Sequence, residues 1–495
     1  MSRVRRAFVM ASLEQYVALL VNLGLVVALS RLLSPSQIGI AVIGLGICAI
    51  TFALREFFTA EFLIQRPTVR RIEVQTSGTI LICVTSLLGL CLLMAAPALS
   101  RAYGTPELVT FIRVMIVAAL IETLSFPAVA LLRRDLNFGG TAMIRIAALL
   151  AMALVAVVLA AKGFGFMSYA WGNLAAACVT AAMATILRPA AFPRRPTLAS
   201  WRVIVDFGRF RGASGMVDRI YDAIPQLVLG RFMPMADVGL YNRLNAVCSI
   251  PDRLLLGSVF AIAFPALSLH VRLGHDVGRI YMHVIGLITV VYWPALFLMV
   301  LLAEPLVLAV LGSAWLQVVP LVRIVGVASL FFFPVILTHP LLMANGRNKS
   351  AFTQNLMSKL IAAVVICSAS PFGLKAMAYS QFVAIPLEMV LALWFARSVV
   401  QFAWRDFAAV VGRSALVTVA TLSGPIGFAL WHRPDLVFNA GEVAIVLLLA
   451  AGGWLAGVRA MAHPVLGEIV AAWQSRRTAN EEQPLGAAVE DAGRG

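Results

Sequence analysis

Two matching segments, LSRLLSPSQIGI at residues 29–40 and LGRFMPMADVGL at residues 229–240, indicate how the chain is organised. At an offset of 200 they share a leucine, an arginine and a glycine, in the pairs Leu29/Leu229, Arg31/Arg231 and Gly39/Gly239. Each segment joins the first two apolar stretches of one half of the chain. The repetition predicts two helical units that are repeated in parallel, with both segments on the same side of the structure.

The composition is that of a membrane protein. Of the 495 residues, 61% are hydrophobic and only 13% are charged, and the mean hydropathy is +0.92. About 20 apolar residues are enough to cross a bilayer as a helix. The apolar stretches therefore predict an all-α polytopic membrane protein with about 14 transmembrane helices, of which the seventh and eighth lie near 206–230 and 239–263. The six cysteines all lie in apolar stretches, so we expect neither disulfides nor a metal site.

The predicted helices divide the chain into two lobes of six, an additional pair and a tail. The boundaries are 1–190 for the N-lobe, 191–205 for a cytoplasmic linker, 206–400 for the C-lobe, 401–461 for spans thirteen and fourteen, and 462–495 for a cytoplasmic tail that is mostly disordered.

The basic residues predict the orientation. The net charge is +16, from 39 Lys and Arg against 23 Asp and Glu. Twenty of the 39 lie in one set of alternate loops and six in the opposite set, and the set that is rich in Lys and Arg is normally cytoplasmic. Both termini are therefore expected in the cytoplasm. This distribution explains the charge as a topology signal, so we expect no nucleic-acid partner.

Several motifs resemble the polysaccharide transporter family of the multidrug/oligosaccharidyl-lipid/polysaccharide exporter superfamily. They are LLSPSQIG at 32–39, LLRRDLNF at 131–138, LGRF at 229–232 with VGLY at 238–241, and FPALS at 264–268. The resemblance covers roughly residues 8–460. It implies a flippase in the bacterial inner membrane that moves a lipid-linked repeat unit of O-antigen, capsule or exopolysaccharide to the periplasmic leaflet by alternating access. The implied partners are an undecaprenyl-diphosphate-linked oligosaccharide, membrane lipids, and polysaccharide polymerase and chain-length or export proteins; no cofactor is implied.

Ionisable side chains inside the predicted spans are candidates for the site, because placing a charge at bilayer depth costs a few kcal/mol unless it faces a cavity or a partner. The cations that we expect to bind the anionic headgroup are Arg113, Arg145, Arg219, Arg323 and Lys359. The acids that we expect to act in gating or ion coupling are Glu14, Glu122, Asp218, Asp222 and Glu388. Arg113 matches Arg323, and Arg145 matches Lys359, in corresponding helices of the two lobes.

A purely structural role is the alternative for each of these charges. Arg219 and Asp222 are three residues apart on one helix, a spacing that favours a local ion pair. Arg145 and Lys359 have no acid within a helical turn.

Two other functions remain open from the sequence. A membrane-embedded polysaccharide polymerase or glycosyltransferase needs acids or bases at a water-facing surface, whereas this chain has no Asp-x-Asp motif and no large predicted periplasmic loop. A drug exporter of the same superfamily would favour an acidic cavity, whereas the repeated membrane charges here are cations. We therefore expect an exporter and not an enzyme.

Overall fold

The computed structural model describes residues 3–55, 62–65, 69–189, 196–252, 273, 276–432 and 436–468, with the side chains of some helical residues, chiefly 3–12 and 205–218, left undescribed. Every regular element in these ranges is a helix. Within these described ranges, twelve helical stretches are long and apolar enough to cross a membrane. The predicted all-α membrane fold is confirmed.

Two of the predicted spans are not among these twelve. The seventh corresponds to α9 (Trp201–Phe232), which is long enough but carries eight charged residues. The eighth begins as α10 (Met235–Cys248), and its predicted continuation lies outside the described residues. The count of fourteen spans stays a prediction.

The described chain forms two compact units. Unit 1 comprises 1–247, 307–321 and 359–380, and unit 2 comprises 248–306, 322–358 and 381–495. Unit 1 thus holds α9 and α10, which the sequence assigned to the C-lobe, together with the N-lobe. The lobe boundaries themselves stay a prediction.

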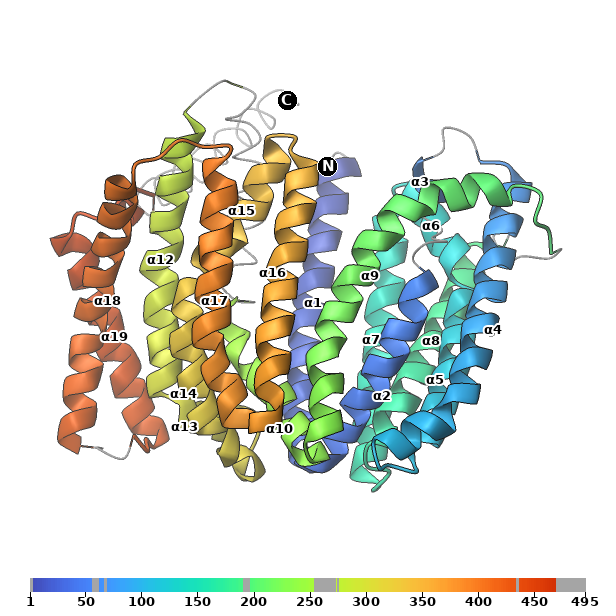
Figure 1. Ribbon diagram of the computed structural model, residues 1–495, viewed down its shortest axis with the longest axis horizontal. Helices are drawn as coiled ribbons and strands as arrows, with labels where there is room; N and C mark the ends of the chain where they lie inside the picture. Colours follow the sequence, from blue (N-terminus) through green and yellow to red (C-terminus); the bar gives the residue numbers. More distant parts are fainter. Residues whose placement is uncertain are drawn as a thin grey trace, which may run out of the picture. The chain divides into compact units, whose positions relative to one another are not determined.

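Unit 1 is built from long helices that alternate in direction (Figure 1). Besides α9 and α10, its helices are α1 (Arg3–Leu32), α2 (Pro35–Ala53), α3 (Phe62–Gln65), α4 (Arg71–Ala102), α5 (Leu108–Thr123), α6 (Phe126–Arg134), α7 (Phe138–Ala161) and α8 (Met167–Leu187). The α1–α2, α4–α5, α7–α8 and α9–α10 connections lie at one end of this unit, which we call the junction end. The short 3₁₀ helices η4 (Ser313–Val318) and η6 (Ser370–Phe372) also belong to unit 1.

The sequence motifs determine where helices stop and start. In LLSPSQIG, Ser34 is the N-cap of α2: its hydroxyl accepts a hydrogen bond from the Gln37 amide, and the Gln37 side chain accepts one from the Ser34 amide at 3.1 Å. Pro35 begins the helix, where its missing N–H is not needed. In LLRRDLNF, Leu136 takes a left-handed conformation with φ 55°, and the Asn137 side chain caps α7. Both motifs are therefore compact helix–turn–helix connections.

Unit 2 contains the end of the chain. Its elements, some of which divide between the two units, are α12 (Val277–Leu301), α13 (Ala303–Val310), α14 (Val319–Ala328), η5 (Ser329–Phe331), α15 (Phe333–Ala344), α16 (Asn348–Ala369), α17 (Leu374–Arg397), α18 (Trp404–His432) and α19 (Ala440–Ala460). The helices α18 and α19 lie side by side (Figure 1). A Cβ on Gly453 of α19 would lie 2.5 Å from the Ala420 carbonyl oxygen of α18, so glycine allows the two backbones to approach.

Candidate functional site

A cavity of about 1460 Å³ lies within unit 1. Its lining residues include Glu14 to Asn22 of α1, Leu45 to Arg55 around the end of α2, Met115 to Glu122 of α5 and Thr141 to Met152 of α7. In α2, α5 and α7 most of these lining residues belong to the half that is farther from the junction end, whereas in α1 they lie around the middle of the helix. The cavity therefore lies mainly in one half of the unit, inside a bundle of membrane-spanning length.

The charged groups of the cavity are mainly cations. Among the described residues, the Arg and Glu side chains that line it are Glu14, Arg55, Glu122, Arg133, Arg145 and Arg219. Four arginines against two glutamates give the described lining a net charge of +2. A cavity with this balance attracts anions, and the apolar helices around it strengthen that attraction by lowering the local dielectric.

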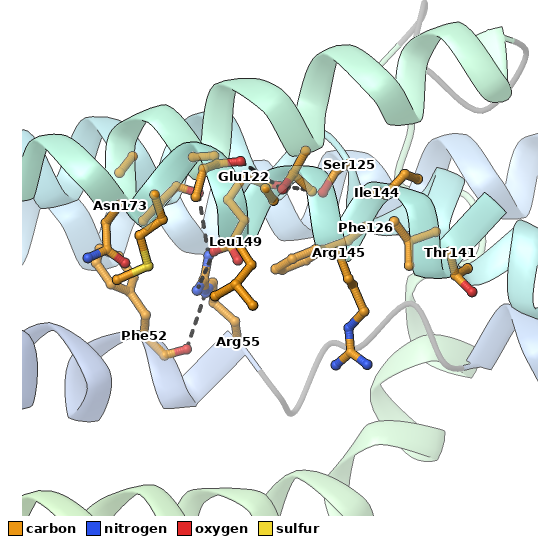
Figure 2. Close-up of a pocket in the computed structure, with 18 of the residues that line it drawn as sticks. Phe52, Arg55, Glu122, Ser125, Phe126, Thr141, Ile144, Arg145, Leu149 and Asn173 are labelled. Carbon is orange, nitrogen blue, oxygen red and sulfur yellow. Dashed lines mark hydrogen bonds and ion pairs between the residues drawn. The ribbon is translucent and has the colours of Figure 1, made fainter. Parts of the chain in front are cut away.

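Arg55 is held rigidly at the end of α2. One guanidinium nitrogen lies 3.4 Å from a carboxylate oxygen of Glu122, and another donates a hydrogen bond to the Thr123 hydroxyl at 3.1 Å. The guanidinium carbon lies 4.9 Å from the ring centre of Phe52 and 5.3 Å from that of Phe126. Only 15% of the Arg55 side chain is exposed, so Arg55 forms part of the cavity wall and does not extend into the open space (Figure 2).

Arg145 is far more accessible. Its guanidinium bonds a carboxylate oxygen of Glu14 at 2.6 Å, so the acid that is absent within a turn of α7 comes from α1 instead. The Arg145 side chain is 64% exposed, whereas that of Glu14 is 16% exposed. Figure 2 shows Arg145 directed away from the Arg55–Glu122 pair, into the space between helices. A soluble anion in the cavity could reach Arg145 and compete with Glu14 for it.

Two further arginines complete the lining. Arg133, in the last turn of α6, is half-buried and has no carboxylate partner among the described residues. The sequence assigned it to a cytoplasmic loop as a topology signal. Arg219 extends from α9, as the sequence placed it within a span, and its side chain is exposed. The side chains of Asp218 and Asp222 lie outside the described part of the structure.

The structure does not bring the other predicted cations to this cavity. Arg113 is exposed on α5 and lies nine residues, or two and a half turns, before Glu122, which puts it on the opposite face of the helix. Lys359 lies in unit 1, where its ammonium is 5.2 Å from the ring centre of Tyr221 on α9.

Arg323 and Glu388 belong to unit 2. Arg323 is half-buried on α14, and its Nε and one terminal nitrogen find no hydrogen-bond partner in the described part of the chain. Glu388 is 8% exposed on α17.

The two repeated sequence segments meet at the junction end of unit 1. A Cβ on Gly39 would lie 1.8 Å from the carbonyl oxygen of Met235, and one on Gly239 would lie 2.0 Å from that of Pro35. Backbone therefore crosses backbone, and each glycine of the repeated pair faces the first residue of the helix that begins in the other segment. The repeat predicted that both segments lie on the same side of the structure, and this contact confirms it.

Hydrogen bonds with residues of α13 and η4 stabilise this crossing. Arg31 donates to the carbonyl oxygen of Ala309 at 2.7 Å, and the Trp315 indole donates to that of Ser30 at 2.7 Å. Trp315 is fully buried and Ser30 is 2% exposed. We call this set of contacts, between residues 30–39, 235–239 and 309–315, the junction contact.

A buried arginine lies beside the junction contact. Arg243 of α10 is 3% exposed, donates a hydrogen bond to the Tyr169 hydroxyl at 2.9 Å and lies 5.9 Å from the ring centre of Trp315. Its Nε has no partner, and no described carboxylate pairs with it. A buried charge without a counter-ion is unfavourable by several kcal/mol in general. Arg243 therefore makes the closed arrangement less stable than its tight packing implies.

The fold and these sites define a polytopic membrane protein with a cation-rich cavity inside its helical bundle and a tight backbone contact that closes one end. The family described as "Polysaccharide biosynthesis protein" matches residues 28–320. The chain belongs to this family.

Curated relatives from three bacteria are similar over most of their length. The succinoglycan biosynthesis transport protein ExoT of Rhizobium meliloti is 25% identical over 70% of this chain and 69% of its own. The lipopolysaccharide biosynthesis protein WzxC of Escherichia coli is 24% identical over 70% and 72%. The teichuronic acid biosynthesis protein TuaB of Bacillus subtilis is 21% identical over 79% and 81%.

Solved structures share the fold. The lipid II flippase MurJ, in an inward closed conformation, superposes with a TM-score of 0.67 at 12% identity, over 93% of this chain and 99% of that protein. An inward-facing multidrug resistance transporter of the MATE family gives a TM-score of 0.61 at 14% identity, over 79% and 98%. At these identities the likeness concerns the fold alone.

Proposed function

We propose that this protein is an inner-membrane exporter of a lipid-linked oligosaccharide repeat unit, which it moves from the cytoplasmic to the periplasmic leaflet during polysaccharide synthesis. The observation that carries this proposal is the cavity of about 1460 Å³ lined by four arginines and two glutamates. The names of the curated relatives, which refer to succinoglycan, lipopolysaccharide and teichuronic acid synthesis, support the polysaccharide as the cargo class.

The chemistry of the cavity fits a diphosphate that joins a polyprenyl chain to sugars, such as undecaprenyl diphosphate. A guanidinium offers a planar pair of donors that matches phosphate oxygens, and such charge-assisted bonds are roughly twice as strong as neutral ones. Arg133, which has no carboxylate partner in the described part of the chain, and Arg145, which is largely exposed, are the groups best placed to receive it. Arg55 and Arg219 add positive charge to the same lining.

The two glutamates give the cavity a means of release. Glu14 pairs with Arg145 and Glu122 with Arg55. Each carboxylate therefore competes with a bound phosphate for its arginine. We propose that this competition keeps the affinity low enough for the headgroup to leave, which is the role in gating that the sequence suggested for these acids.

The junction contact supplies the barrier that alternating access requires. With the N-terminus in the cytoplasm, as the basic loops predict, the junction end faces the periplasm and the cavity lies mainly in the cytoplasmic half of unit 1. The arrangement then corresponds to a state that receives substrate from the cytoplasm. Export would require Gly39 and Gly239 to separate and the bonds of Trp315 and Arg31 to break.

Repeat-unit export in a strain that lacks the chromosomal gene tests this function. Arg133→Ala and Arg145→Ala should each reduce the polysaccharide at the cell surface and leave lipid-linked repeat units on the cytoplasmic leaflet. Arg113→Ala is the matched control, because it removes an equal charge from the face of α5 away from the cavity. Normal export in the Arg133→Ala/Arg145→Ala double variant, at normal protein levels, would refute the assignment.

A further inference from the structure

A second pocket lies in unit 2, at the connection between α17 and α18. It has a volume of about 570 Å³ and is lined by Arg397, Gln401, Phe402 and Ala403. Arg397 is the last residue of α17, and α18 begins at Trp404. The pocket therefore lies where two helices of membrane-spanning length end, which is the depth of the lipid headgroups.

Aromatic rings fix the position of the Arg397 charge. Its guanidinium carbon lies 5.1 Å from the ring centre of Trp404 and 5.8 Å from that of Phe402. These two rings meet edge to face, with centres 5.7 Å apart and planes at 81°. The Arg397 side chain is exposed and forms no ion pair in the described part of the chain. Stacking on aromatic faces orients a guanidinium without neutralising it, so its donors stay available.

The connection itself is held in place from the side of α12. A Cβ on Gly278 would lie 2.7 Å from the Gln401 carbonyl oxygen, so the two backbones are in direct contact there. Phe402 packs against Tyr281 of α12, with ring centres 6.0 Å apart, and against Phe407 of α18 at 6.1 Å. The pocket is thus formed before any ligand arrives, which reduces the entropy lost on binding.

The surroundings combine positive charge with a half-exposed indole. Arg405 at the start of α18 and Arg279 at the start of α12 are both exposed, and Trp404 is 51% exposed. Of the nearby acids, Asp276 uses its carboxylate to cap α12 through the amides of Gly278 and Arg279. Asp406 is exposed in the first turn of α18 and forms no ion pair in the described part of the chain. Tryptophan and arginine together are typical of a membrane–water interface.

We propose that this pocket binds the phosphate of an anionic membrane lipid, with the Arg397 guanidinium as its principal donor and the Gln401 amide beside it. The exposed face of Trp404 would contact the glycerol backbone and the first methylenes of the lipid. Such a site is separate from the transported cargo and does not depend on the proposed function. It would fix the α17–α18 connection to the leaflet whose phospholipids carry negative charge.

Lipid binding by the full-length protein tests the proposal. The purified protein is placed in nanodiscs that contain either phosphatidylglycerol or phosphatidylcholine, and the lipid that remains bound after extraction is counted by native mass spectrometry. Arg397→Ala should weaken retention of phosphatidylglycerol by about tenfold or more, the loss expected for hydrogen bonds to a charged group. Arg405→Ala is the matched control, because it removes an exposed arginine of the same connection that does not line the pocket.

Further variants separate the sources of the phosphate. Arg397→Lys, which keeps the charge but loses the planar fork, should retain an intermediate amount of lipid, and it remains informative if the alanine variant does not fold. Inorganic phosphate at about 10 mM should not displace the lipid, because the ion lacks the part that contacts Trp404. Equal retention in Arg397→Ala and Arg405→Ala would overturn the proposal. Displacement by inorganic phosphate, or binding of that ion without any lipid preference, would overturn the assignment to a lipid.

Discussion

Replacing Gly39 with alanine should open the junction contact. The new Cβ would lie 1.8 Å from the Met235 carbonyl oxygen, whereas real Cβ contacts essentially never fall below 3.0 Å. The two backbones must therefore separate by at least 1.2 Å. Backbone atoms on both sides leave no flexible side chain to move aside. Overpacking of this kind destabilises a packed arrangement by about 3 kcal/mol, which lowers the ratio of closed to open junction by about 100-fold.

Thiol labelling measures this opening. Ser30 is 2% exposed, and its carbonyl oxygen accepts a hydrogen bond from the Trp315 indole N–H. A Ser30→Cys reporter should therefore be protected from labelling while the junction contact is closed. The reporter requires a background without the native cysteines, three of which, Cys83, Cys91 and Cys178, are exposed. A membrane-impermeant maleimide added from the periplasmic side should label the reporter far faster in the Gly39→Ala protein than in the parent.

Gly24→Ala is the matched control for this experiment. It adds the same methyl group to α1, where nothing lies within 4 Å of the new Cβ. Thermal unfolding of both variants distinguishes opening from loss of the fold. If the reporter is labelled at the same rate in Gly39→Ala and Gly24→Ala, the crossing of the two segments does not control access and the reasoning is wrong.

Three other predictions concern charges. Glu14→Gln should strengthen binding of an anionic headgroup by up to about fivefold, because the Glu14 carboxylate no longer competes with the phosphate for Arg145. Isothermal titration with a short-chain polyprenyl diphosphate measures this affinity, and an unchanged value would argue against competition. Arg243→Gln should reduce labelling of the Ser30→Cys reporter, because it removes a buried charge that has no counter-ion among the described residues when the junction contact is closed. Increased labelling would instead indicate that the arginine only holds the helices together. Burial, together with the nearby Arg413 and His283, lowers the pKa of His463 beyond the end of α19, so protonation favours the state in which this turn is detached. As the pH falls below 6.5, the backbone amides of the turn that follows His463 should therefore exchange faster relative to their intrinsic rates, which themselves fall with pH. In His463→Gln this acceleration should disappear.

The fold was largely predictable from the sequence because hydropathy and repetition are properties of the chain alone. The apolar stretches correspond to the long helices, and the repeated glycines at 39 and 239 identified two segments that meet in space. The capping box can also be predicted from the sequence SPSQ at residues 34–37. These features depend on local spacing, which the sequence displays directly.

The cavity was harder to predict because it depends on which face of each helix points inward. Arg113 and Glu122 both lie in one apolar stretch, but half a turn of phase puts only Glu122 at the cavity. Arg133 was interpreted as a topology signal in a cytoplasmic loop, and Arg55, which lies inside the second predicted span, was not among the candidates. The partner of Arg145 was equally hidden, since Glu14 is 131 residues away in sequence. To find these residues, one would need to know how each helix is rotated about its axis, because that rotation decides which side chains face the cavity. The positions of single charges in the sequence do not give it.

The proposed function requires the arginine-lined cavity to carry an anionic lipid-linked oligosaccharide across the membrane. Reconstitution in vesicles measures this step itself: lipid-linked repeat units are placed in the outer leaflet, and their disappearance from that leaflet is followed with an impermeant glycosidase. We expect translocation by the parent protein and by Arg113→Ala, and its loss in the Arg133→Ala/Arg145→Ala double variant. Translocation at the parental rate in the double variant would show that the cavity arginines do not carry the substrate.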